Sequence, residues 1–303
     1  MKSKKDLVIV AAGDASLHTA LRTGREYDLW VVYYGDDDDK AQQYSCDCDL
    51  LLRRQGLKWE IVRSFIERHI TGNGSPFEQY RYILIPDDDL YFPHGSVDIQ
   101  RLFESAEAVK AQIFQPAIRN ENWSVSWEAT RQVPGSYCHA VNIVELMAPG
   151  FTGKLFSRAV LPALNALEFQ RAGWGIEPVI TRFAEILLRR SVRTFVMDVV
   201  PMDHTRPVGR GTMSHQVGYD EAFLMPMIES NRMREYARFN SAEEARAFEF
   251  PFLLGSGDMN AVEEHLTSIR LARSLLADFR RSRILRGAWK FHRLLTRIGG
   301  GNL

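Results

Sequence analysis

Three short apolar runs in the first third of the chain each end in an acidic turn, and this repetition limits the fold more than any other feature. Residues 7–12, 27–34 and 82–86 lead into Gly13-Asp14, Gly35-Asp36 and Asp87-Asp88-Asp89. Continuous apolar runs of this length, closed by turn residues, are typical of strands buried in a parallel sheet. Ligands bind beyond the carboxyl ends of such strands, so the three turns mark one edge of the sheet as the candidate site.

Strand-like and helix-like segments alternate from residue 7 to residue 200, the pattern of an α/β sheet with crossover helices. Helices are expected at 41–54, 97–110, 156–171 and 178–190, and short strands at 59–62 (continuing as a helix toward His69), 112–114 and 193–200. Residues 203–211 resemble a polar turn. From Tyr219 the chain reads as mostly helical, interrupted at 251–257. We therefore expect an α/β domain at 1–218 and a helical extension at 219–303.

The 303 residues can form a sizeable core, and 45% hydrophobic with 25% charged residues is ordinary for a globular protein. The first apolar run is too short for a secretory signal, and no stretch approaches the roughly 20 apolar residues that span a bilayer. A cytoplasmic location is the expectation. The three cysteines, Cys46, Cys48 and Cys138, predict no disulfide framework, and the first two are expected on a helix.

The zero net charge hides an asymmetry. From Arg270 onward nine basic residues stand against one acid, Asp278, so the tail carries a charge of +8. An apolar stripe that includes Trp289 lies among these arginines. A basic amphipathic helix of this kind either lies in an anionic membrane interface or docks its apolar face on the α/β domain or a second subunit. Both readings stay open.

The three consecutive aspartates indicate a cation site. Adjacent carboxylates repel one another, and such a cluster persists when a cation offsets the repulsion or when the turn is fully solvated. Mg²⁺ typically uses one or two carboxylates together with phosphate oxygens of its substrate. In an Asp-x-Asp arrangement, Asp87 and Asp89 would share one cavity while Asp88 turns aside. A solvated acidic turn describes the other acidic run, 36–39, better, because a helix start follows it.

At this point the chain resembles a known class. The segment 82–90 resembles the Asp-x-Asp strand end of GT-A glycosyltransferases and, more narrowly, a bacterial and plant glycosyltransferase-like family known as domain of unknown function 707. Further blocks resemble that family in order: 56–59 with Arg63, Gln115-Pro116-Ala117, 144–149, and Gly173-Trp174-Gly175-Ile176-Glu177. The family often has Glu where Asp88 stands and Asp where Glu177 stands. The resemblance runs from about residue 7 to residue 211 and implies a GT-A fold, a Rossmann-like mixed sheet flanked by helices.

The resemblance also implies roles for single residues. Glu177 would be the base that deprotonates the acceptor, as in the similar Gly-Trp-Gly loop of β-1,4-galactosyltransferases, with Trp174 stacking on a sugar. His204 would complete the ligands of Mn²⁺ (or Mg²⁺) with Asp87 and Asp89, and Asp203 is the reserve ligand. Residues expected to contact the sugar nucleotide are Ala11, Gly13, Asp36, Lys58, Arg63, Asp87, Asp88, Arg206 and Arg210.

Plainer readings accompany several of these roles. Glu177 also suits the first turn of a helix beside Pro178, and Asp36 also suits a helix cap. His204 also reads as a loop histidine, and Lys58 and Arg63 as surface bases. An aromatic platform for the acceptor, formed by Trp123, Trp127 and Tyr137, competes with ordinary core packing.

The sequence therefore predicts a metal-dependent glycosyltransferase that moves a sugar from a nucleotide-sugar donor to a glycan or lipid-linked glycan, with inversion if Glu177 is the base. Polysaccharide biosynthesis is the expected setting, with peripheral contact at the inner face of the membrane and no nucleic-acid partner. The alternatives are a non-catalytic glycan-binding protein on this fold, or a nucleotidyltransferase. The latter usually has a basic phosphate loop after the first strand, whereas residues 11–16 carry no Lys or Arg.

Overall fold

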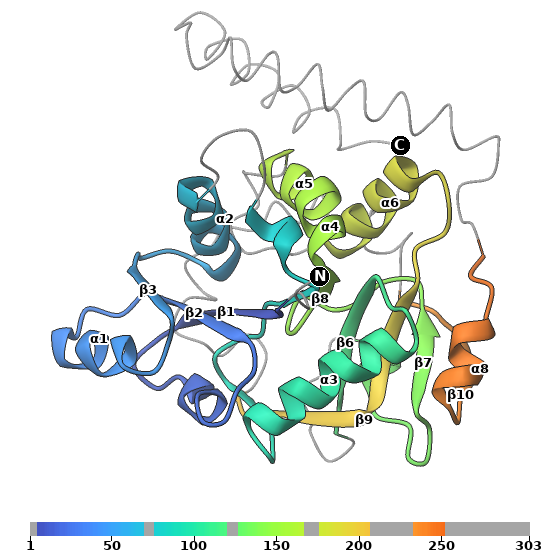
Figure 1. Ribbon diagram of the computed structural model, residues 1–303, viewed down its shortest axis with the longest axis horizontal. Helices are drawn as coiled ribbons and strands as arrows, with labels where there is room; N and C mark the ends of the chain where they lie inside the picture. Colours follow the sequence, from blue (N-terminus) through green and yellow to red (C-terminus); the bar gives the residue numbers. More distant parts are fainter. Residues whose placement is uncertain (1–4, 70–75, 120–126, 167–175, 207–232, 252–303) are drawn as a thin grey trace, which may run out of the picture. The chain divides into compact units, whose positions relative to one another are not determined.

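The computed structural model describes residues 5–69, 76–119, 127–166, 176–206 and 233–251. All of them belong to one compact unit, Met1–Phe252. The second unit, Leu253–Leu303, lies outside the described residues, as does the domain boundary expected at residue 218. The arrangement of the described elements is shown in Figure 1.

A mixed β-sheet forms the centre of this unit. Its strands are β1 (Leu7–Ala12), β2 (Asp28–Tyr33), β3 (Leu50–Arg53), β4 (Tyr82–Leu84), β5 (Leu90–Tyr91), β6 (Ile113–Ile118), β7 (Cys138–Val141), β8 (Gly150–Thr152), β9 (Thr194–His204) and β10 (Glu235–Phe239). The order across the sheet is β10-β7-β9-β6-β8-β4-β1-β2-β3, and β5 pairs with β9 off this path.

Most strands of this sheet point in the same direction, and β7 and β8 run against their neighbours. β1 pairs in parallel with both β2 and β4, β2 with β3, and β6 with β9. β8 is antiparallel to β4 and β6, and β7 is antiparallel to β9 and β10. The carboxyl ends of β1, β2 and β4, which carry the acidic turns, therefore meet at one edge of the sheet.

Helices cover both faces of the sheet. They are α1 (Asp38–Ser45), α2 (Lys58–His69), α3 (Ser96–Ala108), α4 (Gly153–Leu155), α5 (Leu161–Ala166), α6 (Ile176–Leu188) and α8 (Ala242–Ala247), with 3-10 turns η1 (Leu17–Leu21), η2 (Pro76–Gln79) and η3 (Glu128–Thr130) and a π-helical segment η4 (Phe156–Val160). The buried residues of α1, α3 and α8 pack on one face, and those of α2, α4, α5 and α6 pack on the other.

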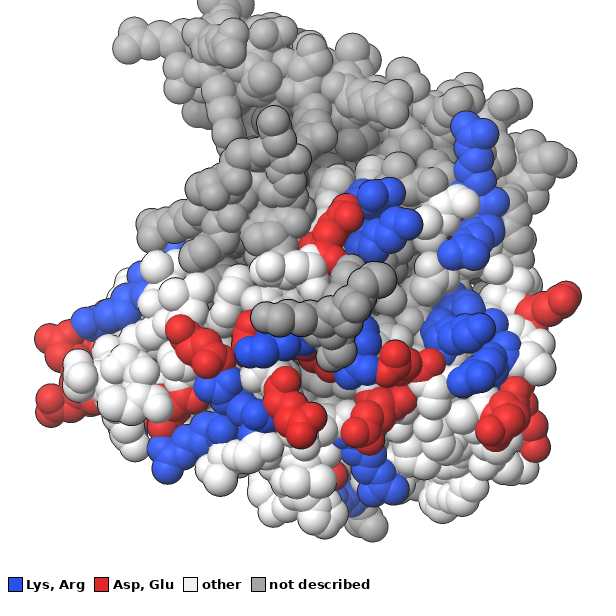
Figure 2. Space-filling view, viewed as in Figure 1, with Lys and Arg blue, Asp and Glu red and all other residues white. Residues whose placement is uncertain are grey.

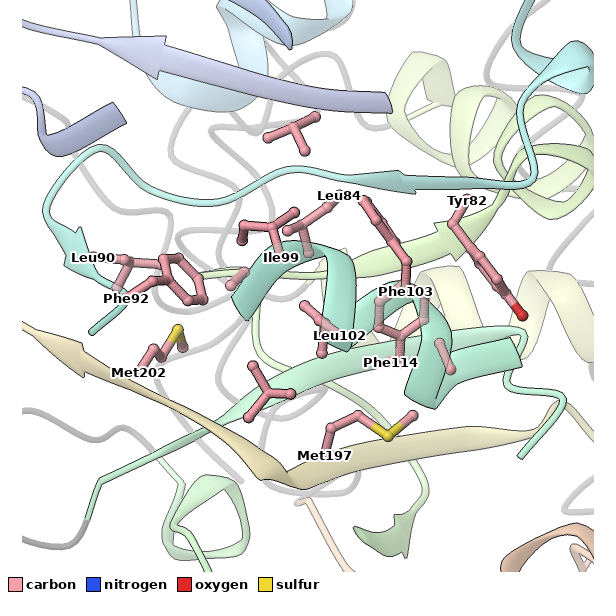
Figure 3. Close-up of a cluster of buried hydrophobic side chains, with 14 of the residues drawn as sticks. Tyr82, Leu84, Leu90, Phe92, Ile99, Leu102, Phe103, Phe114, Met197 and Met202 are labelled. Atoms are coloured by element: carbon pink, nitrogen blue, oxygen red, sulfur yellow. The ribbon is translucent and has the colours of Figure 1, made fainter. Parts of the chain in front are cut away.

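Successive side chains of a buried strand point to opposite faces of the sheet. In β1, Val8, Val10 and Ala12 belong to the core under α3, and the intervening residues belong to the core under α2. This alternation is the period-2 pattern of a strand buried on both sides. Figure 3 shows the α3 side, where Ile99, Leu102 and Phe103 pack against side chains of β4, β6 and β9. The fold class expected from the sequence, a mixed α/β sheet flanked by helices, is confirmed.

Several expected elements are different in the structure. The helix expected at 41–54 ends at Ser45, and residues 50–53 pair with β2 as strand β3. Cys46 is consequently the C-cap of α1 and Cys48 lies beyond it, so both cysteines expected on this helix lie outside it. The strand expected at 59–62 is the first turn of α2, because Trp59 and Val62, three residues apart, both face the core. All three cysteines are free, as expected.

Later elements differ as well. The helix expected at 156–171 is divided into η4 and α5, since Pro162 lacks the N–H that would continue an α-helical ladder from η4. The polar turn expected from residue 203 begins later, because Asp203 and His204 pair with β5. In the segment expected to be helical, residues 235–239 form β10 and extend the sheet at β7.

Acidic and basic side chains are interspersed over the described part of the face shown in Figure 2. Surface ion pairs such as Lys5–Asp28 and Arg158–Glu78 follow from this mixture. Within the part of the chain that the structure describes, none of the helices combines the length and hydrophobicity needed to cross a bilayer.

Candidate functional site

Asp87, Asp88 and Asp89 follow β4 after Ile85 and Pro86 and form a half-buried turn that leads into β5. The backbone N–H of Asp87 donates to the Met147 carbonyl at 2.7 Å, which fixes the beginning of the turn. The three side chains point to three different partners. Their mutual repulsion is therefore offset by donors and cations of the protein itself, and the solvated-turn reading does not apply to them.

Asp87 is paired with Lys58, the first residue of α2. The Lys58 ammonium donates to Asp87 Oδ1 at 2.6 Å and to the carbonyls of Leu146 and Met147 at 2.7 and 3.1 Å. Burial raises the pKa of Asp87, and the Lys58 charge acts in the opposite direction. Because three bonds occupy the three donors of its ammonium group, Lys58 anchors this turn, and the phosphate contact expected from the sequence stays a prediction.

Asp88 turns toward the neighbouring strands. Its Oδ2 accepts the Gly13 N–H at 2.7 Å and the Tyr34 hydroxyl at 3.0 Å, and its carbonyl accepts the Leu17 N–H at 2.7 Å. Burial raises the pKa of Asp88, whereas the bond from Gly13 lowers it. Asp88 thus turns away from Asp87 and Asp89, as the sequence suggested, and holds protein groups.

Asp89 faces His204, the last residue of β9. His204 Nε2 lies 3.3 Å from Asp89 Oδ2, and both side chains are largely buried. Burial opposes ionisation of Asp89, but the bond from His204 and the charges of His204 and Arg206 prevail and lower its pKa. Burial disfavours the protonated form of His204. The bond to Asp89 and the charge of Asp89 outweigh burial, so the pKa of His204 is raised.

The backbone explains why two residues so distant in sequence meet. β5 pairs antiparallel with the end of β9, with Leu90 opposite His204 and Tyr91 opposite Asp203. The Asp89 carbonyl also accepts the backbone N–H and the hydroxyl of Thr205 at 3.0 and 2.7 Å. The bulge in β9 opposite Pro116 and Ala117 precedes this pairing.

Asp89 and His204 fit a divalent cation in ligand type. They supply one oxygen and one imidazole nitrogen, a mixture that Mn²⁺ accepts. Among the described residues, however, no three His, Cys, Asp or Glu side chains are grouped as a ready metal site. The structure therefore brings together two of the three ligands predicted from the sequence. The third, Asp87, is held on Lys58, and the reserve ligand Asp203 pairs with Arg119 at 3.1 Å.

The turns after β1 and β2 lie beside the aspartates. Ala11 and Gly13 are buried, and the Ala11 side chain belongs to the core under α2. Asp36 is exposed, and its carboxylate accepts the Gln55 amide at 2.5 Å. The cap of α1 is Asp37, which accepts the Lys40 N–H at 3.0 Å, so Asp36 does not have the alternative capping role.

Of the remaining predicted residues, one lies in the site, one lies on α2 and two lie outside the described residues. Arg206 is part of the site: its guanidinium donates to the Ala15 carbonyl at 3.0 Å, and its charge contributes to the lowered pKa of Asp89 and acts against the raised pKa of Asp88. Arg63 is half-buried on α2. Trp174 and Arg210 lie outside the described residues.

Glu177 lies in the first turn of α6 and is half-buried. This position agrees with the alternative interpretation of Glu177 as a first-turn acid, which the N-terminus of a helix favours. Its backbone carbonyl accepts the Thr181 hydroxyl at 3.5 Å. The catalytic role of Glu177 stays a prediction.

Sequence reasoning missed a group of tyrosines around the β1 turn. Besides Tyr34, the Tyr44 hydroxyl donates to the carbonyls of Gly13 and Asp14, and the Tyr33 hydroxyl donates to the Asp14 carboxylate. It also missed Glu145, a buried carboxylate whose charge raises the pKa of His204. The available signal was the pair Tyr33-Tyr34 at the carboxyl end of a strand, where side chains reach the site.

No protein-family model matches the sequence, and no curated protein matches it. Among solved structures, S. aureus TarS 1–349 in complex with UDP-GlcNAc is 12% identical, with a TM-score of 0.46 over 75% of this chain and 65% of that chain. Glucosyl-3-phosphoglycerate synthase from Mycobacterium tuberculosis, solved with Mn²⁺, UDP and glucosyl-3-phosphoglycerate, is 12% identical, with a TM-score of 0.35 over 56% and 67%. The glycosyltransferase GlyE of Streptococcus pneumoniae is 10% identical, with a TM-score of 0.38 over 74% and 60%.

The chain thus spans less than two thirds of the length of the TarS chain that it matches. Because the TM-scores lie below 0.5, the reactions of the neighbours carry no argument for this chain. The narrower resemblance to domain of unknown function 707 stays a prediction.

Proposed function

We propose that this chain is a glycosyltransferase that uses a nucleotide sugar as donor and binds a divalent cation at Asp89 and His204. One observation carries the proposal. An aspartate after β4 and a histidine 115 positions later are paired at 3.3 Å, beside the turn after β1. A largely buried Asp–His pair at the carboxyl edge of an α/β sheet is where a ligand and its cation are expected.

The neighbouring residues suit a diphosphate. Arg206 lies against the β1 turn at Ala15 and is a guanidinium donor for phosphate oxygens. A cation on Asp89 and His204, Mn²⁺ or Mg²⁺, would offset the negative charge that develops on the leaving diphosphate. The nucleoside would occupy the turns after β1 and β2, where Gly13 and Asp36 lie. Arg63, Arg210 and Trp174 stay proposed donor contacts.

We assign the base to Glu177. Its carboxylate would take the proton of the acceptor hydroxyl while the acceptor oxygen bonds to the anomeric carbon and the bond to the diphosphate breaks. Attack on the face opposite the leaving group inverts the configuration. The proposed acceptor is a glycan or lipid-linked glycan, and the proposed location is cytoplasmic with peripheral membrane contact through the basic tail.

Titration calorimetry with a panel of nucleotide sugars, with and without Mn²⁺, tests the proposal. We expect heat from at least one donor that depends on the cation and is lost in Asp89→Ala and His204→Ala. Asp38→Ala is the matched control, because Asp38 is an exposed acid of the other acidic run, paired with Arg53. Donor binding that is unchanged by chelator would contradict the cation site. No heat from any donor would contradict the proposed function and favour a glycan-binding protein.

A further inference from the structure

Asp88 connects three adjacent strands through one oxygen atom. β2, β1 and β4 are neighbours in the sheet, and their carboxyl ends carry Tyr34, Gly13 and Asp88. Asp88 Oδ2 accepts the Gly13 N–H at 2.7 Å and the Tyr34 hydroxyl at 3.0 Å. A carboxylate oxygen has two lone pairs, so two donors fill the capacity of Oδ2.

This contact requires glycine at position 13, because glycine has no side chain to meet the Tyr34 ring. A Cβ at residue 13 would lie 2.7 Å from the Tyr34 hydroxyl oxygen and 2.8 and 2.9 Å from two ring carbons. Any larger residue would push the Tyr34 ring away from Asp88. The Gly13 N–H and the Tyr34 hydroxyl therefore reach Asp88 together only with glycine at this position.

The rest of the β1 turn is fixed from other sides. Its Gly13 carbonyl accepts the Tyr44 hydroxyl at 3.0 Å, and its Ala15 carbonyl accepts the Arg206 guanidinium at 3.0 Å. The backbone N–H of Leu17 donates to the Asp88 carbonyl at 2.7 Å. Within the described residues, the Gly13 N–H donates to the Asp88 carboxylate, so this side chain fixes the start of the β1 turn against the aspartates.

We propose that Asp88 is a positioning residue, which holds the β1 turn at a set distance from Asp89 and His204 so that a nucleotide on that turn presents its diphosphate to the cation. The inference rests on the proposed function. It assigns to Asp88 bonds within the protein and no contact with the cation or the donor. Bonds to an ionised acceptor are about twice as strong as neutral ones, which is the advantage of a carboxylate at this position.

Three variants separate positioning from direct binding. Asp88→Asn keeps an oxygen that can accept both bonds, Asp88→Ala removes the acceptor, and Tyr34→Phe removes one donor without touching Asp88. We expect the Michaelis constant for the donor to rise about tenfold in Asp88→Ala and about threefold in the other two. The Michaelis constant for the acceptor should not change. If Asp88 bound the cation or the donor, Asp88→Asn would be as harmful as Asp88→Ala, and Tyr34→Phe would be silent.

Tyr80→Phe is the matched control. Its hydroxyl donates to Asp28 Oδ2 at 3.0 Å, so the variant loses a half-buried Tyr–Asp bond of equal length at the other end of β2. It should lower the melting temperature as Tyr34→Phe does and leave the donor Michaelis constant unchanged. An equal rise of that constant in both tyrosine variants would overturn the inference.

A second measurement does not depend on activity. Amide hydrogen exchange of Gly13 in the ligand-free protein should be slow in the wild type, slightly faster in Asp88→Asn and Tyr34→Phe, and at least tenfold faster in Asp88→Ala. Unchanged exchange in Asp88→Ala would overturn the inference. If no nucleotide sugar binds the wild type, the proposed function fails, while Gly13 exchange still decides whether Asp88 holds the turn. If Asp88→Ala does not fold, Tyr34→Phe decides it.

Discussion

Each aspartate of the turn has its own partner, and the partner of Asp87 is Lys58. Lys58 occupies its three donors on Asp87, Leu146 and Met147. Lys58→Met keeps the length of the side chain but leaves the carboxylate and two carbonyls without this donor. We expect the free energy of unfolding to fall by about 1–3 kcal/mol, measured by urea denaturation.

The exposed Lys154 provides the control for Lys58. Lys154→Met should change the free energy of unfolding by no more than about 0.5 kcal/mol. If Lys58→Met is equally mild and instead abolishes donor binding, the phosphate-binding role predicted from the sequence would be right and the anchoring role wrong.

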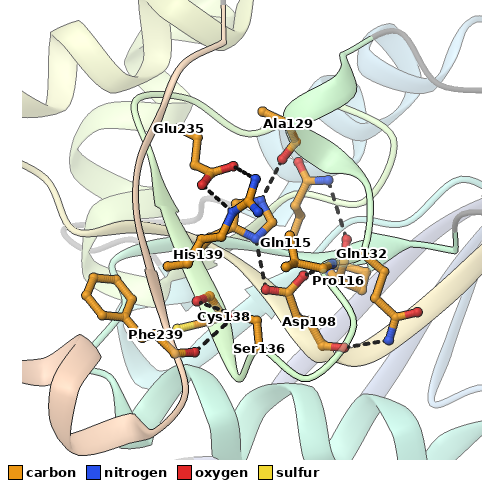
Figure 4. A network of polar contacts seen from close by, with 12 residues as sticks. Gln115, Pro116, Ala129, Gln132, Ser136, Cys138, His139, Asp198, Glu235 and Phe239 are labelled. Atoms are coloured by element: carbon orange, nitrogen blue, oxygen red, sulfur yellow. Dashed lines mark hydrogen bonds and ion pairs between the residues drawn. The ribbon is translucent and has the colours of Figure 1, made fainter.

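His139 and Asp198 form a fully buried pair at the centre of the polar network in Figure 4. His139 Nδ1 lies 2.9 Å from the Asp198 carboxylate, and Nε2 lies 2.7 Å from the Ala129 carbonyl. Both partners are acceptors, so both ring nitrogens must carry protons to satisfy them. Burial opposes this charge, but Asp198 and the Ala129 carbonyl outweigh it and raise the pKa of His139.

This raised pKa predicts how stability depends on pH. The folded-state pKa lies above the ordinary value of 6.5, so the contribution of the pair is complete below pH 6.5 and is lost as pH rises through the folded-state pKa. The excess stability of the wild type over His139→Gln should therefore shrink with rising pH above 6.5. Urea denaturation of both proteins from pH 5.5 to 9 measures it. A pH-independent difference would show that His139 is neutral in the folded protein.

At the scale of elements, one arginine joins the ends of two helices to the sheet. The Arg193 guanidinium, just before β9, donates to the carbonyls of Val109, Ala245 and Phe248 at 3.1, 2.7 and 2.8 Å. It also lies over the ring of Phe195 at 5.5 Å. The last carbonyls of α3 and α8 are thereby satisfied by a single planar fork.

Lysine cannot reproduce this fork, because it is a compact charge without the planar geometry of guanidinium. We expect Arg193→Lys to lower the free energy of unfolding by about 1–3 kcal/mol, measured by thermal and urea denaturation. Arg158→Lys is the control, since Arg158 makes an exposed ion pair with Glu78, and should cost less than about 1 kcal/mol. Equal effects of the two substitutions would contradict the role of Arg193 in joining α3 and α8.

Elements with a continuous apolar pattern were predictable from the sequence. β1 was expected at 7–12 and lies at Leu7–Ala12, since six buried residues are closed by a Gly-Asp turn. β3 was not, because its residues are half-buried or exposed and its strand character comes from pairing with β2. β10 was missed for a similar reason, since its outer residues are exposed or half-buried and β7 supplies the pairing.

The candidate site was likewise predictable in part. The proximity of Asp89 and His204 followed from the resemblance, and the structure places them together. The partners of Asp87 and Asp88 were not predictable, because Lys58, Gly13 and Tyr34 become neighbours only through the strand order β2-β1-β4 and the position of α2.

At the scale of the whole molecule, charge distinguishes the end of the chain from the rest. The nine basic residues from Arg270 onward, against Asp278, leave the tail at +8 in a chain of zero net charge. Each Lys or Arg near an anionic bilayer contributes about 1 kcal/mol of binding at low salt, and the contribution falls as salt screens it. A chain ending at Phe252 keeps the sheet as described, because the ten strands found among the described residues lie within Met1–Phe252.

We therefore expect the full chain to sediment with vesicles that contain anionic lipid, more weakly as salt increases, and not with vesicles of neutral lipid alone. The chain ending at Phe252 should keep its cooperative melting and lose sedimentation. A full-length variant with Arg280, Arg281 and Arg283 replaced by Gln separates charge from apolar contact, because it keeps Trp289 and the apolar stripe. If this variant binds as the wild type does, the arginines do not hold the tail on the membrane. If the full chain binds neither kind of vesicle, the tail instead packs on protein, the alternative that the sequence left open.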